Sequence, residues 1–435
     1  MEFVVAAVGM PANFDAAAAT DAYIATMDAA ARARSDAYFE GGYWLILVNL
    51  IAGLAMAWLL LQTGFSRALR DRVRAIVKSK SLTVATYAAI YTLVTTLILF
   101  PLTLWQGYFR EHAFGLSTMS LGGWVSEQAI GLVMGMVMAA LFLTVFYIVL
   151  RVAKQAWWMW GAAVSVMLLG TAIFVSPVFI DPLFNEYTPM EEGELRDDIL
   201  ALAEANGIPA DNVYVFDVSR QSNRITANVN GLFGTTRIAL SDTLIDNTDP
   251  DEVLAVMGHE MGHYALNHLW EMFIIFAVVL AIGFAFTDRL FAIVNDRFGK
   301  KWGVSGISDI AGLPLLAACL SVYFFIATPV FNTVIRTNEA EADIFGLNAA
   351  REPDGFATAA LRLASYRKID PGSWEEFVFF DHPSGRARIA MSMQWKAGQL
   401  AIGAADQTPE LRLDRAQAIS ASLVGPAPEG GNPDP

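Results

Sequence analysis

The stretch VMGHEMGHYALNH, residues 256–268, decides the fold around it, because its histidines can act together only on a helix. His259 and His263 are four residues apart and are therefore neighbours on one face of an α-helix. At this spacing both imidazoles can reach one zinc ion, and Glu260 points beside them toward a water molecule on that ion. A bare HExxH pattern also occurs by chance, so the residues around it must support the interpretation.

The residues before the motif predict the helix that it needs. Asp249 can cap a helix, Pro250 suits the first helical position, and Glu252 completes a capping box. No proline follows before the next apolar run, and we expect the helix to continue straight into that run. His268 comes five residues after His263, which places it off the metal face. We interpret it as an interfacial or capping histidine.

The sequence RTNEAEADIFG, residues 336–346, offers a third ligand. Glu339 and Asp343 are again four residues apart and share a helix face, whereas Glu341 points away. We therefore expect Glu339 to complete the zinc site, with Glu341 as the fallback ligand. Asp343 can accept the second N–H of a ligating histidine. The alternative is that these acids form a solvated helix face, as such runs do elsewhere.

Composition indicates a membrane protein. Hydrophobic residues make up 55% of the 435 residues and charged residues 17%, a balance that a soluble globule would struggle to keep off its surface. Six apolar runs approach the ~20 residues that a helix needs to cross the hydrocarbon core, at about 42–62, 83–105, 130–150, 156–180, 270–287 and 310–334. We expect a mainly α-helical, polytopic fold embedded in a lipid bilayer.

The cysteine content and the net charge limit the possible properties further. The single cysteine, Cys319, can form no internal disulfide. The net charge is −14 and no basic groove is apparent, which excludes nucleic acid as a partner.

Polar segments divide the apolar runs into regions. We expect an amphipathic N-terminal helical region (1–40), spans one to four (41–180), a loop domain with HExxH (181–269), spans five and six (270–334), a C-terminal region with the third ligand (335–424) and a flexible tail (425–435).

The loop domain is expected to combine a helix with a small β-sheet. Thr188 can cap a helix whose first residue is Pro189, and Glu191 would complete the capping box. Three strand-like segments follow, VYVFDV (213–218), RITANVN (224–230) and RIALSD (237–242). The segment GLFGTT (231–236) is typical of a hairpin turn between the last two.

Several motifs in a fixed order make the chain resemble a known family. They are DPLFNEYTPMEEGELRDDI (181–199), RIALSDTLI (237–245), MGHEMGHYALNH (257–268), NEAEADIFG (338–346) and FDHPSGRAR (380–388). Together they resemble the type I CAAX prenyl proteases, integral-membrane zinc endopeptidases related to the HtpX heat-shock proteases. The resemblance implies one zinc ion held by His259, His263 and Glu339, with Glu260 as general base. It also implies a ring of membrane helices around a water-filled chamber.

The same resemblance assigns roles outside the zinc motif. His382 and Arg388 match residues that face the active site and steady the oxyanion, with Arg386 as the competitor of Arg388. Relatives carry asparagine where this chain has Thr226, which puts substrate preference in question. The edge strand that follows can still pair with an extended substrate through its backbone, at Ala227, Asn228, Val229 and Asn230.

The sequence therefore predicts a membrane zinc metalloendopeptidase whose substrate is a protein or peptide. The resemblance implies removal of the C-terminal tripeptide of prenylated proteins. An alternative is a quality-control protease for membrane proteins with no prenyl requirement. A minor alternative is a metal transporter, but the apolar runs carry acids only at or beside their ends, at Glu271, Asp288 and Asp309.

The location is a cell inner membrane if the source is bacterial and the endoplasmic reticulum if it is eukaryotic. The loop after the first span carries six basic residues, Arg67, Arg70, Arg72, Arg74, Lys78 and Lys80. By the positive-inside rule this loop faces the cytoplasm, which places the zinc-bearing regions on the opposite side. Processing of prenylated proteins requires the cytoplasmic side, so the two arguments conflict.

Overall fold

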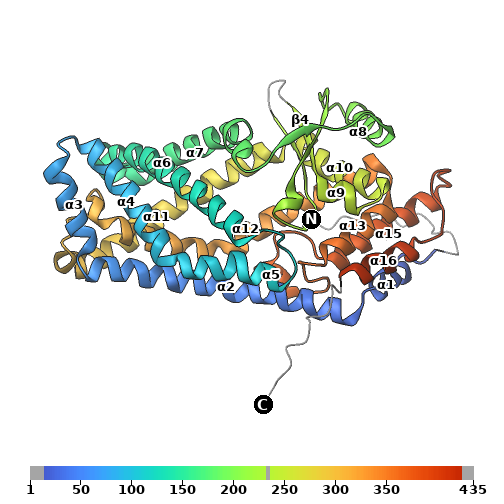
Figure 1. The fold of residues 1–435 in the computed structure, drawn as a ribbon, viewed down its shortest axis with the longest axis horizontal. Helices are drawn as coiled ribbons and strands as arrows, with labels where there is room; N and C mark the ends of the chain where they lie inside the picture. Colours follow the sequence, from blue (N-terminus) through green and yellow to red (C-terminus); the bar gives the residue numbers. More distant parts are fainter. Residues whose placement is uncertain (1–13, 232–235, 424–435) are drawn as a thin grey trace, which may run out of the picture.

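The protein is elongated, with long helices at one end and a sheet with shorter helices at the other (Figure 1). The computed structural model describes residues 14–231 and 236–423. The predicted tail (425–435) and the centre of the predicted hairpin turn (232–235) lie outside these residues. We call the end that holds the sheet the metal end, for reasons given below, and the opposite end, where α3 (Phe65–Ile76) lies, the distal end.

Six long helices form a ring. Each contacts the next in chain order, and the last returns to the first. They are α2 (Ala29–Gln62), α4 (Lys80–Leu104), α6 (Leu121–Ala153), α7 (Trp157–Val175), α11 (His268–Trp302) and α12 (Leu313–Ala350). The ring agrees with the expected helix barrel, and the water-filled interior stays a prediction.

Five of these helices are long and apolar enough to cross a bilayer, and the chain is a multi-pass membrane protein. The fourth predicted span, 156–180, is the short one, because the apolar stretch of α7 runs only from Trp157 to Ile173. A π-helical turn, η3 (Ser176–Ile180), follows it directly. The count of about six spans is therefore met by five full-length helices and one shorter one.

Apolar packing ties the ring together at the distal end. One buried cluster draws large side chains from all six helices, among them Leu61, Tyr87, Phe146, Trp157, Phe291 and Leu316. Cys319 is buried in the same cluster. Because tightly packed side chains resist displacement, this cluster fixes the spacing of the helices where they meet.

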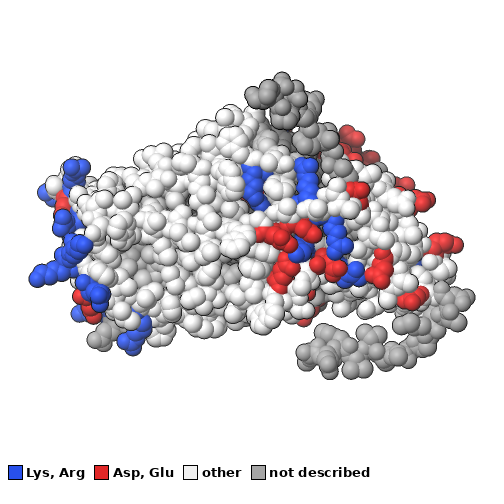
Figure 2. All heavy atoms as spheres, turned by 90° about the horizontal axis from the view of Figure 1, so that it is seen from below, with Lys and Arg blue, Asp and Glu red and all other residues white. Residues whose placement is uncertain are grey.

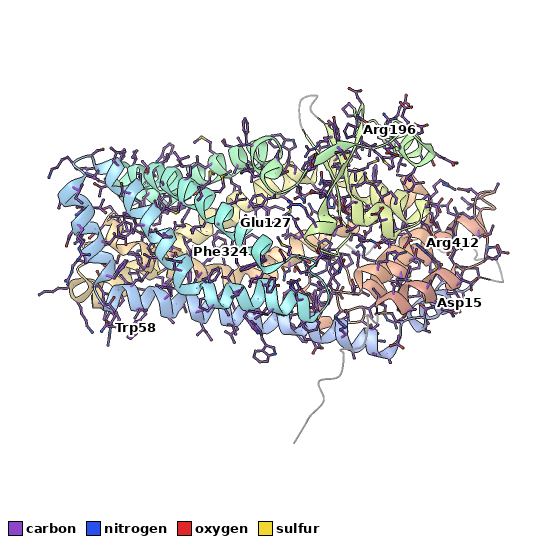
Figure 3. The ribbon with its side chains drawn as sticks, in the orientation of Figure 1. Asp15, Trp58, Glu127, Arg196, Phe324 and Arg412 are labelled. Carbon is purple, nitrogen blue, oxygen red and sulfur yellow. The ribbon has the colours of Figure 1, made fainter. Side chains whose placement is uncertain are left out.

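Charge separates the two ends. Seen from below, Lys and Arg gather at the distal end, while the middle of the molecule is nearly free of charged side chains (Figure 2). Phe324 lies in this middle region, on α12, and Trp58 lies near the distal end, on α2, whereas Asp15, Arg196 and Arg412 lie at the metal end (Figure 3). The basic loop and the sheet thus lie at opposite ends, and which end faces the cytoplasm stays a prediction.

The sheet has four strands in the order β1-β2-β4-β3, namely β1 (Tyr187–Pro189), β2 (Val213–Phe216), β3 (Ala227–Asn230) and β4 (Arg237–Ser241). β3 and β4 are antiparallel, as the predicted hairpin requires, and β3 is an edge strand. The prediction of a helix that begins at Pro189 was wrong. Thr188 and Pro189 pair with β2 instead, and α8 (Glu194–Ala205) begins only after Gly193. Pairing with a neighbouring strand outweighs the local capping signal.

The helix of the HExxH motif does not run into the next span, which corrects that expectation. α10 (Pro250–Ala265) starts at the predicted capping box of Asp249 and Glu252. It stops at Leu266, and Asn267 takes a positive φ of 60° before α11 begins. Asparagine tolerates this left-handed conformation better than most residues, so the chain can change direction there.

The metal end is completed by helices from both ends of the chain. α1 (Ala16–Ala25) packs on α13 (Pro353–Leu363), α15 (Gly385–Ala401) and α16 (Leu413–Leu423) through a second buried cluster. The N-terminal region was expected to be helical; it holds α1 and the start of α2, which are separated by a break at 26–28, and α2 then continues into the first span. The region boundaries at 40, 269 and 334 thus fall inside continuous helices. The shorter helices are α5 (Glu111–Ala113), α9 (Asp242–Asn247) and α14 (Ser373–Phe379).

Candidate metal centre

Two helices cross closely enough to bring the HExxH motif to an acidic residue. α10 carries the histidines and α12 carries Glu339. A Cβ added to Gly346 on α12 would lie 2.7 Å from the backbone nitrogen of His259. One added to Gly258 on α10 would lie 3.0 Å from the carbonyl oxygen of Gly346. The two backbones are therefore in contact, and only glycine fits at the crossing.

Three ligand atoms converge at this crossing. His259 Nε2 lies 3.2 Å from His263 Nε2 and 3.2 Å from Glu339 Oε2. His263 Nε2 lies 3.5 Å from Glu339 Oε1. Two ligands of a tetrahedral zinc ion, each ~2.1 Å from it, stand about 3.4 Å apart. The three side chains can therefore hold one such ion.

The hydrogen bonds around these atoms also fit a cation. Glu339 Oε2 is buried and makes no hydrogen bond with any described residue. His259 Nδ1 lies 2.7 Å from Asp343 Oδ1, and because a carboxylate only accepts, the imidazole proton sits on Nδ1. The Nε2 lone pair then faces Glu339. Without a positive ion, lone pairs and a carboxylate would face one another in a buried space.

Asp343 is itself held by an arginine. It is fully buried, and Arg388 donates to both of its oxygens, from Nη2 at 2.5 Å and from Nε at 3.0 Å. The resemblance predicts that Arg388 stabilises the oxyanion. In the structure, two of its donors instead bind the carboxylate that orients His259. Its side chain also lines the cavity beside the metal centre.

His268 and Glu341 lie beside the second histidine ligand. His263 Nδ1 is 2.9 Å from His268 Nδ1, and His268 Nε2 is 3.4 Å from Glu341 Oε2. Glu341, the fallback ligand, therefore faces His268 and not the metal group. If His268 directs its Nε2 proton to Glu341, its Nδ1 accepts from His263, which leaves the Nε2 of His263 free to bind a metal.

A cavity of about 190 Å³ opens beside the ligands. Glu260 lines it, and burial raises the pKa of its carboxyl, which suits a group that accepts a proton near neutral pH. Of the four predicted substrate-pairing residues, Ala227 lines the cavity, and Asn228, Val229 and Asn230 continue the edge strand away from it. β3 has β4 on one side and no strand among the described residues on the other.

His382 closes the same cavity. Its Nδ1 lies 2.8 Å from Asp381 Oδ1, and its Nε2 lies 3.2 Å from Glu339 Oε2. Burial lowers the pKa of His382. Because the Nδ1 proton goes to Asp381, the neutral ring has an acceptor at Nε2. Arg386, the competitor of Arg388, instead forms ion pairs with Asp21 and Asp370 and does not line the cavity.

Sequence reasoning missed part of this cavity. Phe356, Leu363, Tyr366 and Arg367 line it from α13 and the turn that follows. No motif marks these residues, because their place depends on how α13 packs against α10.

His112 lies outside this cavity. Both of its ring nitrogens lie 2.8 Å from backbone carbonyls, those of Tyr108 and Met119, so its contacts are local.

The part of the chain that holds this site matches known proteins. Residues 189–396 match the model of peptidase family M48, and residues 16–186 match that of the CAAX prenyl protease N-terminal region, described as five membrane helices. The chain is 31% identical over 343 residues to the uncharacterized metalloprotease YhfN of Bacillus subtilis, which covers 78% of this chain and 80% of that protein.

Two further relatives extend the comparison. A CAAX prenyl protease 1 homolog of Dictyostelium discoideum is 33% identical over 254 residues, or 57% of this chain and 58% of that protein. The crystal structure of S. mikatae Ste24p superposes with a TM-score of 0.71, covering 87% of this chain and 95% of that one at 20% identity. At that identity the superposition establishes the fold.

Proposed function

The chain belongs to peptidase family M48 and is a membrane zinc metalloprotease, and on this premise we propose that it removes short C-terminal segments from membrane-anchored proteins. The CAAX prenyl proteases among its relatives are named for such a reaction. Prenylated protein C-termini are therefore the first substrates to test. Family membership leaves the metal-transporter alternative without support.

The position of the metal centre carries this proposal. Glu339 is the 27th residue of α12, about 40 Å along the helix from its start at 1.5 Å per residue. The hydrocarbon core of a bilayer is about 30 Å thick. His263 lies five residues before the first residue of α11, the span that follows it. If the hydrocarbon core begins near the start of α12, the ligands would lie near the membrane surface, where a lipid-anchored chain end could reach them.

The proposed mechanism uses residues around the cavity. His259, His263 and Glu339 would hold a zinc ion, which would supply Lewis-acid polarisation of the scissile carbonyl and of the attacking water. Glu260 would take a proton from that water and deliver it to the leaving amine. The free edge of β3 would pair with the substrate backbone. Asp343 would fix the His259 tautomer, and Arg388 would hold Asp343 in place.

His382 and Arg388 would stabilise the oxyanion together. His382 can donate from Nε2 only as an imidazolium, since its Nδ1 proton is bonded to Asp381, and the nearby oxyanion would favour this charged form against the burial that lowers the His382 pKa. Arg388 would add its positive charge from the cavity wall. His382→Ala should therefore lower kcat, whereas zinc content should stay at one ion per chain.

Glu260→Gln is the decisive test. The variant should bind one zinc ion per chain and cleave nothing, because glutamine keeps the shape but cannot accept a proton. Zinc is measured by elemental mass spectrometry, and cleavage by mass spectrometry of prenylated and unprenylated peptides with and without a zinc chelator. Cleavage at the parent rate by this variant would remove Glu260 from the mechanism.

The edge of β3 that pairs with no described strand favours a second candidate function. Backbone pairing does not depend on side-chain identity, so the same edge suits turnover of misfolded membrane proteins without a prenyl requirement. Equal cleavage of prenylated and unprenylated peptides, together with internal cuts in a destabilised membrane protein, would favour this second function. A strong preference for the prenylated peptide would favour the first.

A further inference from the structure

One arginine in the cavity makes no direct ion pair with a described carboxylate, and Asp381, an acid that feels its charge, is bonded to His382 instead. Arg367 follows α13, and its Nη2 lies 3.4 Å from His382 Nε2. Among the described residues, no carboxylate lies within ion-pair distance of its guanidinium. Neighbouring arginines differ: Arg388 binds Asp343, Arg362 binds Glu252, and Arg386 binds Asp21 and Asp370.

The surroundings of Arg367 make this cation costly and fix its place. It is half-buried, and the cavity around it is lined partly by apolar side chains, such as Phe356 and Leu363, and partly by the charged groups Glu260 and Arg388. Its backbone is held by the Ser35 hydroxyl, which donates to the Arg367 carbonyl at 3.1 Å. A charge in such a place is stabilised by an ion of opposite sign. The guanidinium fork matches a carboxylate in two parallel hydrogen bonds.

Its distance from the metal ligands is short. His382 Nε2 stands between them, 3.4 Å from Arg367 Nη2 and 3.2 Å from Glu339 Oε2. The guanidinium and the Glu339 carboxylate are therefore separated by at most about 7 Å, the span of two extended residues. A group bound at Arg367 belongs to a residue close to the scissile bond.

We propose that Arg367 binds a carboxylate of the substrate, within a few residues of the bond that is cut. This inference rests on the proposed peptidase function and adds a substrate class to it. The carboxylate can come from the free C-terminus of the substrate or from an Asp or Glu side chain. Both offer the same planar anion.

Matched peptides separate the two sources. The full-length zinc-loaded protein is given one peptide with a free C-terminal carboxylate three residues after the cleavage site and the same peptide as a C-terminal amide. A second pair carries Glu or Gln at these three positions in a chain extended at its C-terminus. In one of the two pairs, we expect kcat/KM to be about tenfold or more higher for the peptide with the carboxylate than for its amide counterpart. Most of this difference should come from a lower KM.

The preference should depend on Arg367. In Arg367→Gln the acid-to-amide or Glu-to-Gln ratio should fall to about one, and Arg367→Lys should restore part of it because the charge remains. Arg386→Gln is the matched control, since Arg386 pairs outside the cavity, and it should keep the parent ratio. Zinc content and thermal unfolding show that each variant is folded and loaded.

Two results would overturn the inference. One is an unchanged ratio in a folded, zinc-loaded Arg367→Gln protein. The other is an equal loss of kcat for every peptide, which would place Arg367 at the reaction centre through His382. Binding of the same peptides to Glu260→Gln, followed by fluorescence anisotropy, gives the ratio without turnover. Absence of cleavage would then count against the proposed function alone, and absence of a carboxylate preference in binding would count against Arg367.

Discussion

The distal end and the metal end of the helix ring are held together in opposite ways. At the distal end, large apolar side chains such as Phe146 and Trp157 fill the space between six helices. At the metal end, α10 and α12 touch through glycines, and buried charges such as Asp343 and Arg388 are bonded to each other. In the first arrangement, the volume of the packed side chains sets the spacing of the helices. The second fixes the position of a few atoms, and its disruption should affect chemistry before it affects folding.

Loss of a metal ligand should have the largest effect on zinc binding. Glu339→Ala removes one of three ligands, and the variant should purify without zinc and show no cleavage, because two histidines alone leave the ion with too few protein ligands. Elemental mass spectrometry and the peptide assay measure both. Full zinc occupancy in this variant would mean that another acid, such as Glu341, can replace Glu339.

Loss of the charge behind a ligand should have a smaller effect. Asp343→Asn keeps an oxygen for His259 Nδ1 but leaves Arg388 without its anion. Zinc affinity should fall about 10- to 100-fold, the usual range for outer partners of metal ligands. Competition with a chelator of known affinity measures this. An unchanged affinity would show that Asp343 serves the packing of Arg388 and not the metal.

The helix crossing should be sensitive to a single methyl group. Gly346→Ala would place a carbon 2.7 Å from the His259 nitrogen and should destabilise the protein by about 1–3 kcal/mol, with a loss of zinc affinity smaller than that of Asp343→Asn. Gly131→Ala is the control, because a Cβ there meets nothing within 4 Å. Thermal unfolding compares the two, and equal midpoints would show that the helices can separate freely.

Change at the distal end should leave zinc binding nearly untouched. Phe146 is 2% exposed and packs against Trp157 and Phe284. Phe146→Ala should lower stability by about 3–5 kcal/mol while the folded protein still binds one zinc ion per chain. A loss of zinc as large as that of Asp343→Asn would show that the two ends are coupled.

The sequence predicted what depends on short-range geometry. The ligand set followed from two pairs of residues four apart, and the crossing of α10 and α12 then brought the pairs together. The full-length spans followed from their apolar length alone. In each case the signal lies within a few helical turns, where the periodicity of the α-helix fixes which side chains are neighbours.

What depends on distant contacts was missed. Thr188 and Pro189 carry the marks of a helix start, but β2 offers a strand partner that no local pattern reveals. The break at Asn267 replaces a continuous helix although no proline or glycine marks it. Arg367 reaches the cavity only because α13 packs on α10. Tertiary packing decides each of these positions.

If the substrate binds at the edge of β3, where no described strand pairs, the rate at which a given target is cut depends on the target's own structure. A strand can be added to a sheet edge only by a segment whose own backbone groups are free, so a helical target must first unwind locally. The free energy of that unwinding then adds to the barrier for cleavage. Two targets with identical cleavage sites would differ in rate according to how readily each site frays.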